Sequence, residues 1–121
     1  MAYLIGIDIG TSGTKCALFD EAGQLKASHT VGYPMAQPHN GYAEQDPEDW
    51  WQATLEGLKA ISRAVPSKDI RGIGLSGQMH GLVMLDASGK VLRPSIIWCD
   101  QRTAAECEEI TRRVGLDRLM A

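Results

Sequence analysis

The first twenty residues constrain the fold most, because two strand-length segments flank a turn bounded by glycines. Tyr3–Ile9 is apolar apart from one carboxylate and one glycine, and Thr14–Asp20 follows the turn Gly10-Thr11-Ser12-Gly13. Short segments joined in this way predict a β-hairpin. A second turn, which ends at Gly23, leads into Gln24–Tyr33, so we predict a three-stranded antiparallel meander.

A helix is predicted after the polar loop that lies between Pro34 and Gln45. Asp46 is suited to cap its first turn, Pro47 to occupy its first position, and acidic residues follow where the helix dipole favours them. Apolar side chains then recur with helical spacing until Pro66 ends the pattern. The positions expected to face the core are Trp50, Thr54, Gly57, Leu58, Ile61 and Val65, supported by Trp51 and Leu55.

Three more strands and a last helix are predicted in the second half of the chain. The strand-like segments are Ile70–Leu75, Gly81–Asp86 and Ile96–Trp98. The helix is expected to begin at a capping box that starts with Thr103 and to end at Gly115. A meander, a helix and a returning strand together indicate a mixed α/β sheet. The Asp-x-x-Gly turn at residues 20–23 recurs at residues 86–89, which indicates similar local turns and not a repeat architecture.

Composition excludes several classes of function. The chain has 121 residues, enough for one domain core, and its 12 basic and 15 acidic side chains form no basic stripe, so nucleic acid is not an expected partner. No apolar run reaches the length of a membrane span, and no basic segment precedes an apolar one as in a secretory signal. Cys16, Cys99 and Cys107 lack paired spacing, so we expect reduced thiols, no metal cluster and a cytoplasmic location.

The first turn is a candidate phosphate-binding loop. Asp8 ends a buried strand, where a carboxylate is costly to desolvate unless it binds a donor or a cation. Glycines let the turn direct several backbone N–H groups at one point, so it can hold a terminal phosphate while Asp8 holds Mg²⁺. The alternative, left open by these residues alone, is a plain hairpin turn whose aspartate caps backbone amides.

Two later segments are candidates for binding a polyhydroxylated substrate. Gln78 and His80 lie between glycines after a strand, and both side chains can donate and accept hydrogen bonds. Trp98 offers an indole face for the C–H face of a sugar, and Asp100 with Arg102 can orient hydroxyl groups. The alternatives are a hydrogen-bonded turn histidine and a core tryptophan followed by a capping aspartate and a solvated arginine.

Two nucleotide-binding patterns are excluded. Residues 72–77 match G-x-G-x-x-G by letter, but these glycines lie within or after a predicted strand and do not open a long helix. The pattern G-x-x-x-x-G-K-[ST] is absent.

Four motifs in this order resemble the amino-terminal part of the FGGY-family carbohydrate kinases, the xylulokinase branch in particular. They are Gly6–Lys15, Glu44–Trp51, Gly77–Gly81 and Ile97–Arg102. The resemblance implies an α/β fold of the ribonuclease-H-like type shared with actin and hexokinase. Residues 1–121 would then be the amino-terminal part of the first kinase domain, an incomplete first lobe, with the second domain absent.

The resemblance also implies a site and a reaction. ATP phosphates would lie against Gly10, Thr11, Ser12, Gly13, Thr14 and Lys15, with Asp8 holding Mg²⁺. The sugar would contact Gln78, Met79, His80, Trp98, Asp100 and Arg102. The expected reaction is transfer of the γ-phosphoryl group of ATP to the 5-hydroxyl of D-xylulose, with the proton-accepting aspartate outside this chain.

Other readings stay open at this point. The sugar could be ribulose, gluconate or fuculose, or the chain could belong to an actin- or chaperone-like ATP-binding module without a sugar acceptor. The last segment, Leu116–Ala121, shows no natural terminus, so we expect the coding sequence to continue. A homodimer of the full-length enzyme is also left open.

Overall fold

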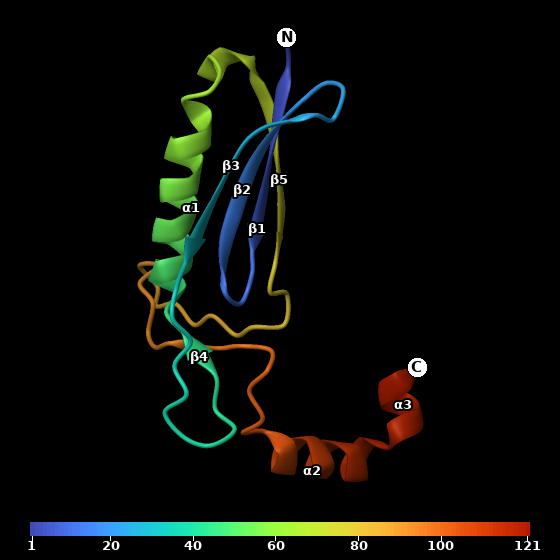
Figure 1. Cartoon of the computed structure of the whole chain (residues 1–121). Coiled ribbons are helices and arrows are strands. Elements are labelled where there is room, and N and C mark those ends of the chain that lie inside the picture. The colour runs from blue at the N-terminus through green and yellow to red at the C-terminus, as the bar shows by residue number, and fades with distance from the viewer.

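Four strands form the main sheet of the computed structural model, which describes residues 1–121 (Figure 1). They lie in the order β3-β2-β1-β5, with the bounds β1 Tyr3–Ile9, β2 Gly13–Asp20, β3 Leu25–Gly32 and β5 Ile70–Gly77. The first three strands are antiparallel, as predicted. β5 pairs in parallel with β1, with Asp8 opposite Ser76, so both strands end at the same edge of the sheet.

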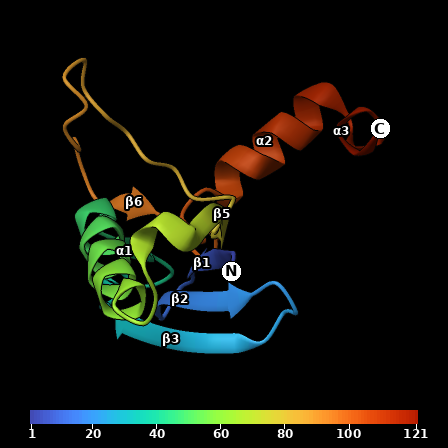
Figure 2. The ribbon, with the colours of Figure 1, turned by 90° about the horizontal axis from the view of Figure 1, so that it is seen from above.

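Helix α1 (Pro47–Ser62) covers one face of this sheet and connects β3 to β5 (Figures 1 and 2). Its predicted start is confirmed, because the Asp46 side chain accepts a hydrogen bond of 2.9 Å from the backbone N–H of Glu48. The core lies between helix and sheet and contains Ile5, Ile7, Cys16, Leu18 and Ile61. Of the apolar positions expected to face this core, Trp51 is wrong: its side chain is 56% exposed.

Helix α1 approaches the sheet closely at Gly57. A Cβ atom placed there would lie 2.5 Å from the Cys16 Sγ atom, which real contacts do not allow. The absence of a side chain at Gly57 therefore lets the helix pack directly on β2. This contact also accounts for the burial of Cys16, whose thiol pKa is raised by desolvation.

The segment between β5 and α2 differs most from its prediction. Gly81–Asp86 is not a strand, and the predicted strand at Ile96–Trp98 is reduced to β6 (Ser95–Ile96), which pairs with β4 (Glu44–Gln45) outside the main sheet. The apolar side chains at residues 82–85 are 42–54% exposed, so no packed layer stabilises a strand there. Two isolated bridges, Leu82 to Ile96 and Leu85 to Val91, are all the pairing that remains.

Both Asp-x-x-Gly turns form as expected. Asp20 accepts hydrogen bonds from the N–H groups of residues 22 and 24, and Asp86 accepts them from those of residues 88 and 90. Gly23 and Gly89 adopt φ of 78° and 82°, a conformation that favours glycine. These turns explain the sequence similarity between the two segments without a structural repeat.

Helices α2 (Ala104–Val114) and α3 (Leu116–Met120) extend away from the sheet (Figures 1 and 2). The end of α2 at Gly115 is confirmed, with φ of 94°. The capping box is wrong, because Thr103 makes no side-chain hydrogen bond to the backbone and has φ −96° and ψ 19°, outside the extended region typical of a cap. A short 3₁₀ turn at Ser67–Asp69 precedes β5. No helix combines the length and the apolar composition that a membrane span requires.

Candidate functional site

A hollow of about 330 Å³ lies where β1 and β5 end. Because the two strands are parallel and adjacent, the residues that follow them meet although some 70 positions separate them in the sequence. This edge is where open α/β sheets commonly bind ligands. The lining consists of Asp8, Gly10, Thr11, Gly77, Gln78, Met79, His80 and Trp98. The hollow therefore brings together parts of three of the predicted motifs.

The turn after β1 is closed by its own backbone and packs tightly against β3. The N–H of Gly10 donates to the Gly13 carbonyl oxygen over 3.0 Å, which closes the turn. A Cβ atom at Gly13 would lie 2.6 Å from the Val31 carbonyl oxygen, so only glycine fits against β3. The exposed Asp8 side chain borders the hollow and lies on the face of the sheet that α1 does not cover, as its alternation with the buried Ile7 requires.

Tyr33 forms hydrogen bonds with this turn, and the sequence analysis did not identify it as a site residue. Its hydroxyl group donates to the Gly10 carbonyl oxygen and lies 3.3 Å from the Thr14 Oγ1 atom. The backbone N–H of Tyr33 donates to the Ser12 carbonyl oxygen over 3.3 Å. Desolvation is the main reason that the pKa of the Tyr33 phenol is raised. The sequence signal that could have identified Tyr33 is its place as an aromatic residue at the end of the predicted third strand.

Four predicted phosphate-site residues do not line the hollow. Thr14 is fully buried, with its hydroxyl directed at Tyr33, and Lys15 lies on β2 opposite Asp8. Ser12 and Gly13 belong to the turn but also lie outside the lining. Direct contact between these four residues and a phosphate stays a prediction, and what the structure shows for Thr14 is a role in holding the turn.

Gln78 connects the second motif to the turn. Its backbone N–H donates to the Ile9 carbonyl oxygen over 3.0 Å, and its Nε2 atom donates to the Gly10 carbonyl oxygen over 3.1 Å and to the Gln45 Oε1 atom over 2.9 Å. The Gln78 Oε1 atom is buried and has no hydrogen-bond partner. A buried acceptor of this kind is costly unless a ligand donates to it, so it fits a hydroxyl group bound in the hollow.

The other side chains around the hollow are exposed. Met79 is 80% exposed and Trp98 61% exposed, and His80 is exposed as well. The indole Nε1 of Trp98 donates to the Thr11 Oγ1 atom over 2.9 Å, which fixes the ring beside the turn. Trp98 is therefore not the core tryptophan of the alternative reading, and its exposed ring is available to a ligand.

Asp100 and Arg102 lie outside the hollow and bind each other. The Asp100 side chain is only 2% exposed and accepts hydrogen bonds from Arg102 and from the N–H of Ala43, the latter over 2.7 Å. Arg102 also contacts Glu44 over 2.8 Å and lies 3.8 Å above the centre of the Tyr42 ring. Their direct contact with a sugar stays a prediction, since the structure uses their polar groups to hold residues 42–44.

This pairing explains two pKa shifts. The hydrogen bond from Arg102 is the main cause that lowers the pKa of Asp100 far below its ordinary value, with further contributions from backbone N–H groups. The same hydrogen bond, together with Glu44, raises the pKa of Arg102. Glu44 accepts from Arg93 as well, over 2.8 Å, so the cluster connects three segments of the loop region. Sequence reasoning missed Glu44 and Arg93, although Glu44 stands in a motif it quoted.

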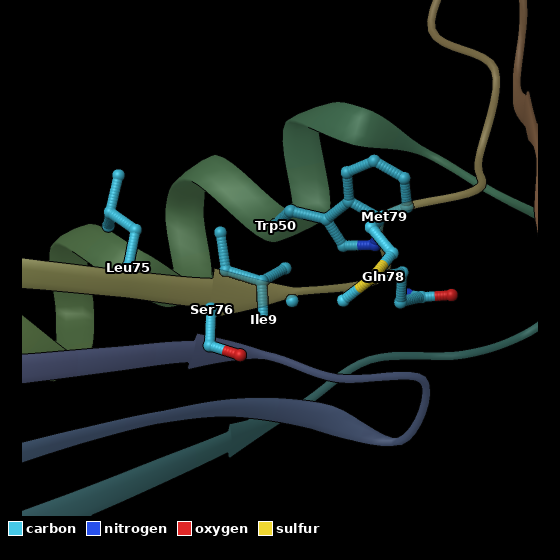
Figure 3. A pocket seen from close by; sticks show the side chains of 7 residues that line it. Ile9, Trp50, Leu75, Ser76, Gln78 and Met79 are labelled. Atoms are coloured by element: carbon cyan, nitrogen blue, oxygen red, sulfur yellow. The ribbon is translucent and has the colours of Figure 1, made fainter.

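A second, more apolar hollow of about 430 Å³ lies beside the first (Figure 3). Ile9 and Leu75 line it from the sheet, and the indole of Trp50 lines it from α1, close to Gln78 and Met79. The two hollows share Gly77, Gln78 and Met79, so the end of β5 and the two residues after it separate them.

Comparison with known proteins identifies the family. The family model described as the N-terminal domain of the FGGY family of carbohydrate kinases matches residues 3–121. The chain belongs to the FGGY family of carbohydrate kinases. Its match covers every motif that forms the hollow, so the predicted recognition is confirmed.

Relatives within the FGGY family include proteins named for xylulose and for gluconate. The chain is 48% identical over 120 residues to the xylulose kinase of Staphylococcus xylosus, covering 99% of this chain and 25% of that protein. The xylulose kinase structure from Rhodospirillum rubrum matches with TM-score 0.91 and 32% identity, over 98% of this chain and 25% of that one. The gluconate kinase structure from Lactobacillus acidophilus matches with TM-score 0.86 and 35% identity, over 93% of this chain and 23% of that one.

These similarities confirm the predicted fold class. The chain has the mixed α/β fold of the FGGY sugar kinases, which is the ribonuclease-H-like fold of actin and hexokinase. The chain spans about a quarter of the length of the curated relatives it matches.

Proposed function

We propose that the protein to which this chain belongs transfers the γ-phosphoryl group of ATP to D-xylulose and forms D-xylulose 5-phosphate. The observation that carries the proposal is the single hollow that joins Asp8 and the turn residues Gly10 and Thr11 to the segment Gln78-Met79-His80. A phosphate site and a sugar site must meet within one cavity for direct transfer. The xylulose kinases among the relatives support the choice of sugar.

The residues on the two sides of the hollow suit different ligands. We propose that the turn directs backbone N–H groups at the terminal phosphates of ATP and that Trp98 and the Gln78 Oε1 atom orient the sugar from the other side. Asp8 fits a Mg²⁺ site, because its exposed carboxylate borders the hollow beside the turn. When bound there, Mg²⁺ would neutralise phosphate charge as the phosphoryl group moves.

The remaining machinery is proposed to lie outside this chain. Residues 1–121 would be the amino-terminal part of the first kinase domain, and the carboxylate that accepts the proton from the sugar hydroxyl would belong to a later segment. The match to an N-terminal domain and the quarter-length coverage of relatives support this arrangement. A cytoplasmic location fits the three free thiols.

A sugar panel tests the proposal. The full-length enzyme is assayed for ATP-dependent phosphorylation of D-xylulose, ribulose, gluconate and fuculose. We expect kcat/KM for D-xylulose to exceed the others by about tenfold or more, a difference that one or two additional hydrogen bonds supply. A higher value for gluconate would favour the activity named for the relative from Lactobacillus acidophilus. ATP hydrolysis that no sugar accelerates would overturn sugar phosphorylation altogether.

A further inference from the structure

Gln45 lies at the centre of the hydrogen bonds that join the two halves of the hollow, although it does not line the hollow itself. The residue is 2% exposed and forms the short strand β4 with Glu44. Its side-chain amide takes part in three hydrogen bonds. A buried amide with every partner inside the protein has one preferred orientation, because rotating it would leave buried groups unpaired.

Each hydrogen bond of Gln45 leads to a different part of the molecule. The Nε2 atom donates to the Thr11 carbonyl oxygen over 2.6 Å, in the turn proposed to bind phosphate. The Oε1 atom accepts from the Gln78 Nε2 atom over 2.9 Å, in the segment proposed to bind sugar. The same oxygen accepts from the Trp50 Nε1 atom over 3.1 Å, which ties the amide to α1.

The position of Gln45 is itself fixed by regular structure. Its backbone pairs with Ser95 of β6, and the next residue, Asp46, caps α1. The amide is therefore held between a strand pair and a helix start, which gives it a rigid base. Loss of the amide would leave the Thr11 carbonyl oxygen without this donor and would leave the Gln78 Nε2 atom with its hydrogen bond to the Gly10 carbonyl oxygen alone.

We propose that Gln45 is a positioning residue that sets the phosphate-binding turn and Gln78 in one common geometry. The inference rests on the proposed function, because it assigns the two ends of its hydrogen bonds to ATP and to sugar. It predicts that one substitution, at a residue that touches neither substrate, weakens the use of both. Hydrogen bonds from one rigid group hold each of the two loops in place, so removing the group releases both loops, whereas removing one bond releases only one of them.

Two substitutions separate the two ends of this connection. Gln45→Met has a similar length and removes all three hydrogen bonds. Gln45→Glu keeps an acceptor for Gln78 and Trp50 but directs a carboxylate oxygen, in place of a donor, at the Thr11 carbonyl oxygen. Thr54→Val is the matched control, because this buried hydroxyl bonds only the Trp50 carbonyl oxygen, 2.8 Å away, and reaches neither loop.

The measurements are made on the full-length enzyme. They are kcat, KM for ATP, KM for the sugar, the Kd of ADP by calorimetry and the melting temperature. We expect Gln45→Met to raise both KM values and the Kd of ADP by about five- to tenfold, the effect of one lost buried hydrogen bond at each end. Gln45→Glu should raise KM for ATP and the Kd of ADP by a similar factor while changing KM for the sugar less than twofold. Thr54→Val should lower the melting temperature and leave the binding constants unchanged.

A purely structural role for Gln45 would give a different result. Gln45→Met would then melt early, as Thr54→Val does, while its folded fraction keeps wild-type KM and Kd values, and this outcome overturns the inference. If Gln45→Met does not fold, Gln45→Glu decides, and an unchanged Kd of ADP overturns it. Failure of the wild-type enzyme to phosphorylate D-xylulose would refute the proposed sugar only, because the ADP measurements need no sugar.

Discussion

At the scale of single residues, Asp8 differs from the other carboxylates of the main sheet. It is exposed at the edge of the hollow, on the strand that leads directly into the turn. Asp20, in contrast, accepts hydrogen bonds from two backbone N–H groups and pairs with Lys26 over 3.1 Å, so its side chain is used for structure. The position of Asp8 and not its residue type is what distinguishes a candidate cation ligand from a turn cap.

We predict that Asp8→Asn in the full-length enzyme lowers kcat by on the order of a hundredfold or more, because the site would lose the charge that holds Mg²⁺. Stability should change by less than about 0.5 kcal/mol, since the side chain is exposed. Steady-state kinetics and a thermal melt check both parts. An unchanged kcat would refute the magnesium role.

Tyr33 supplies a second prediction at this scale. Tyr33→Phe removes the hydroxyl that bonds the Gly10 carbonyl oxygen and Thr14, so we expect a loss of about 1 kcal/mol in the free energy of unfolding. Because the pKa of the folded phenol is raised, its contribution is fully present below about pH 10 and is lost as pH rises through the folded value. The free energy of unfolding is measured with urea as a function of pH, and above pH 10 it should decline less steeply for the variant than for the wild type.

At the scale of elements, the loop region depends on charge pairs more than on apolar packing. Residues 82–85 are exposed, while Asp100, Arg102 and Glu44 are between 2% and 15% exposed and hold residues 42–44 against the segment before α2. The two-residue strands β4 and β6 contribute few backbone hydrogen bonds of their own. The cluster therefore fixes where Gln45 and Trp98 lie relative to the main sheet.

The Asp100 cluster predicts a pH dependence. Arg102 and backbone N–H groups lower the pKa of Asp100, so its stabilising contribution is present above the unfolded value of about 3.9 and is lost as pH falls toward the folded one. Asp100→Asn should be less stable than the wild type at pH 7, and the difference should narrow below about pH 4. Urea unfolding at pH 7, 4 and 3 measures this, and a difference that stays constant with pH would contradict it.

At the scale of the whole molecule, much apolar surface has no partner within the chain. Only 15 of the 121 residues are buried, and exposed apolar side chains occur on the open face of the sheet, on the β5 edge and on α2 and α3. Examples are Leu4, Ile73, Leu75, Ile110 and Leu116, each at least 50% exposed. A single layer of one helix on one face leaves the other face of a sheet uncovered, which limits the hydrophobic stabilisation available.

We therefore predict marginal stability for the isolated chain of 121 residues. Its thermal unfolding should be broad and occur at low temperature, because too little apolar surface is removed from water. Calorimetry and circular dichroism check this. A cooperative transition at high temperature would contradict it.

We also predict that the isolated chain does not phosphorylate D-xylulose. The proposed arrangement places the proton-accepting carboxylate and the second phosphate loop outside residues 1–121, so the hollow alone provides only part of the positioning that transfer requires. A coupled assay for ATP-dependent phosphorylation measures the activity. Turnover by the purified chain would refute the proposed division of the site.

Local patterns in the sequence predicted most of the architecture. Turn chemistry at Asp20 and Gly23 and the cap at Asp46 depend on neighbouring residues alone, so the meander and the start of α1 could be predicted. The strand expected at Gly81–Asp86 is wrong because a short run of apolar residues forms a strand only where a neighbouring strand pairs with it. The capping box at Thr103 failed for a similar reason, since its geometry depends on how the preceding segment enters the helix.

The sequence by itself determined which chemical groups are available: a carboxylate before a glycine-bounded turn, an amide beside an imidazole, and an indole, in the order that identifies the family. Only the tertiary structure decided which of them meet. The parallel pairing of β1 with β5 brings Gln78 beside Gly10, while Thr14 is turned into the core and Asp100 is held by Arg102. Long-range pairing sets these outcomes because each side chain's partners come from distant segments, and no local pattern encodes that distance.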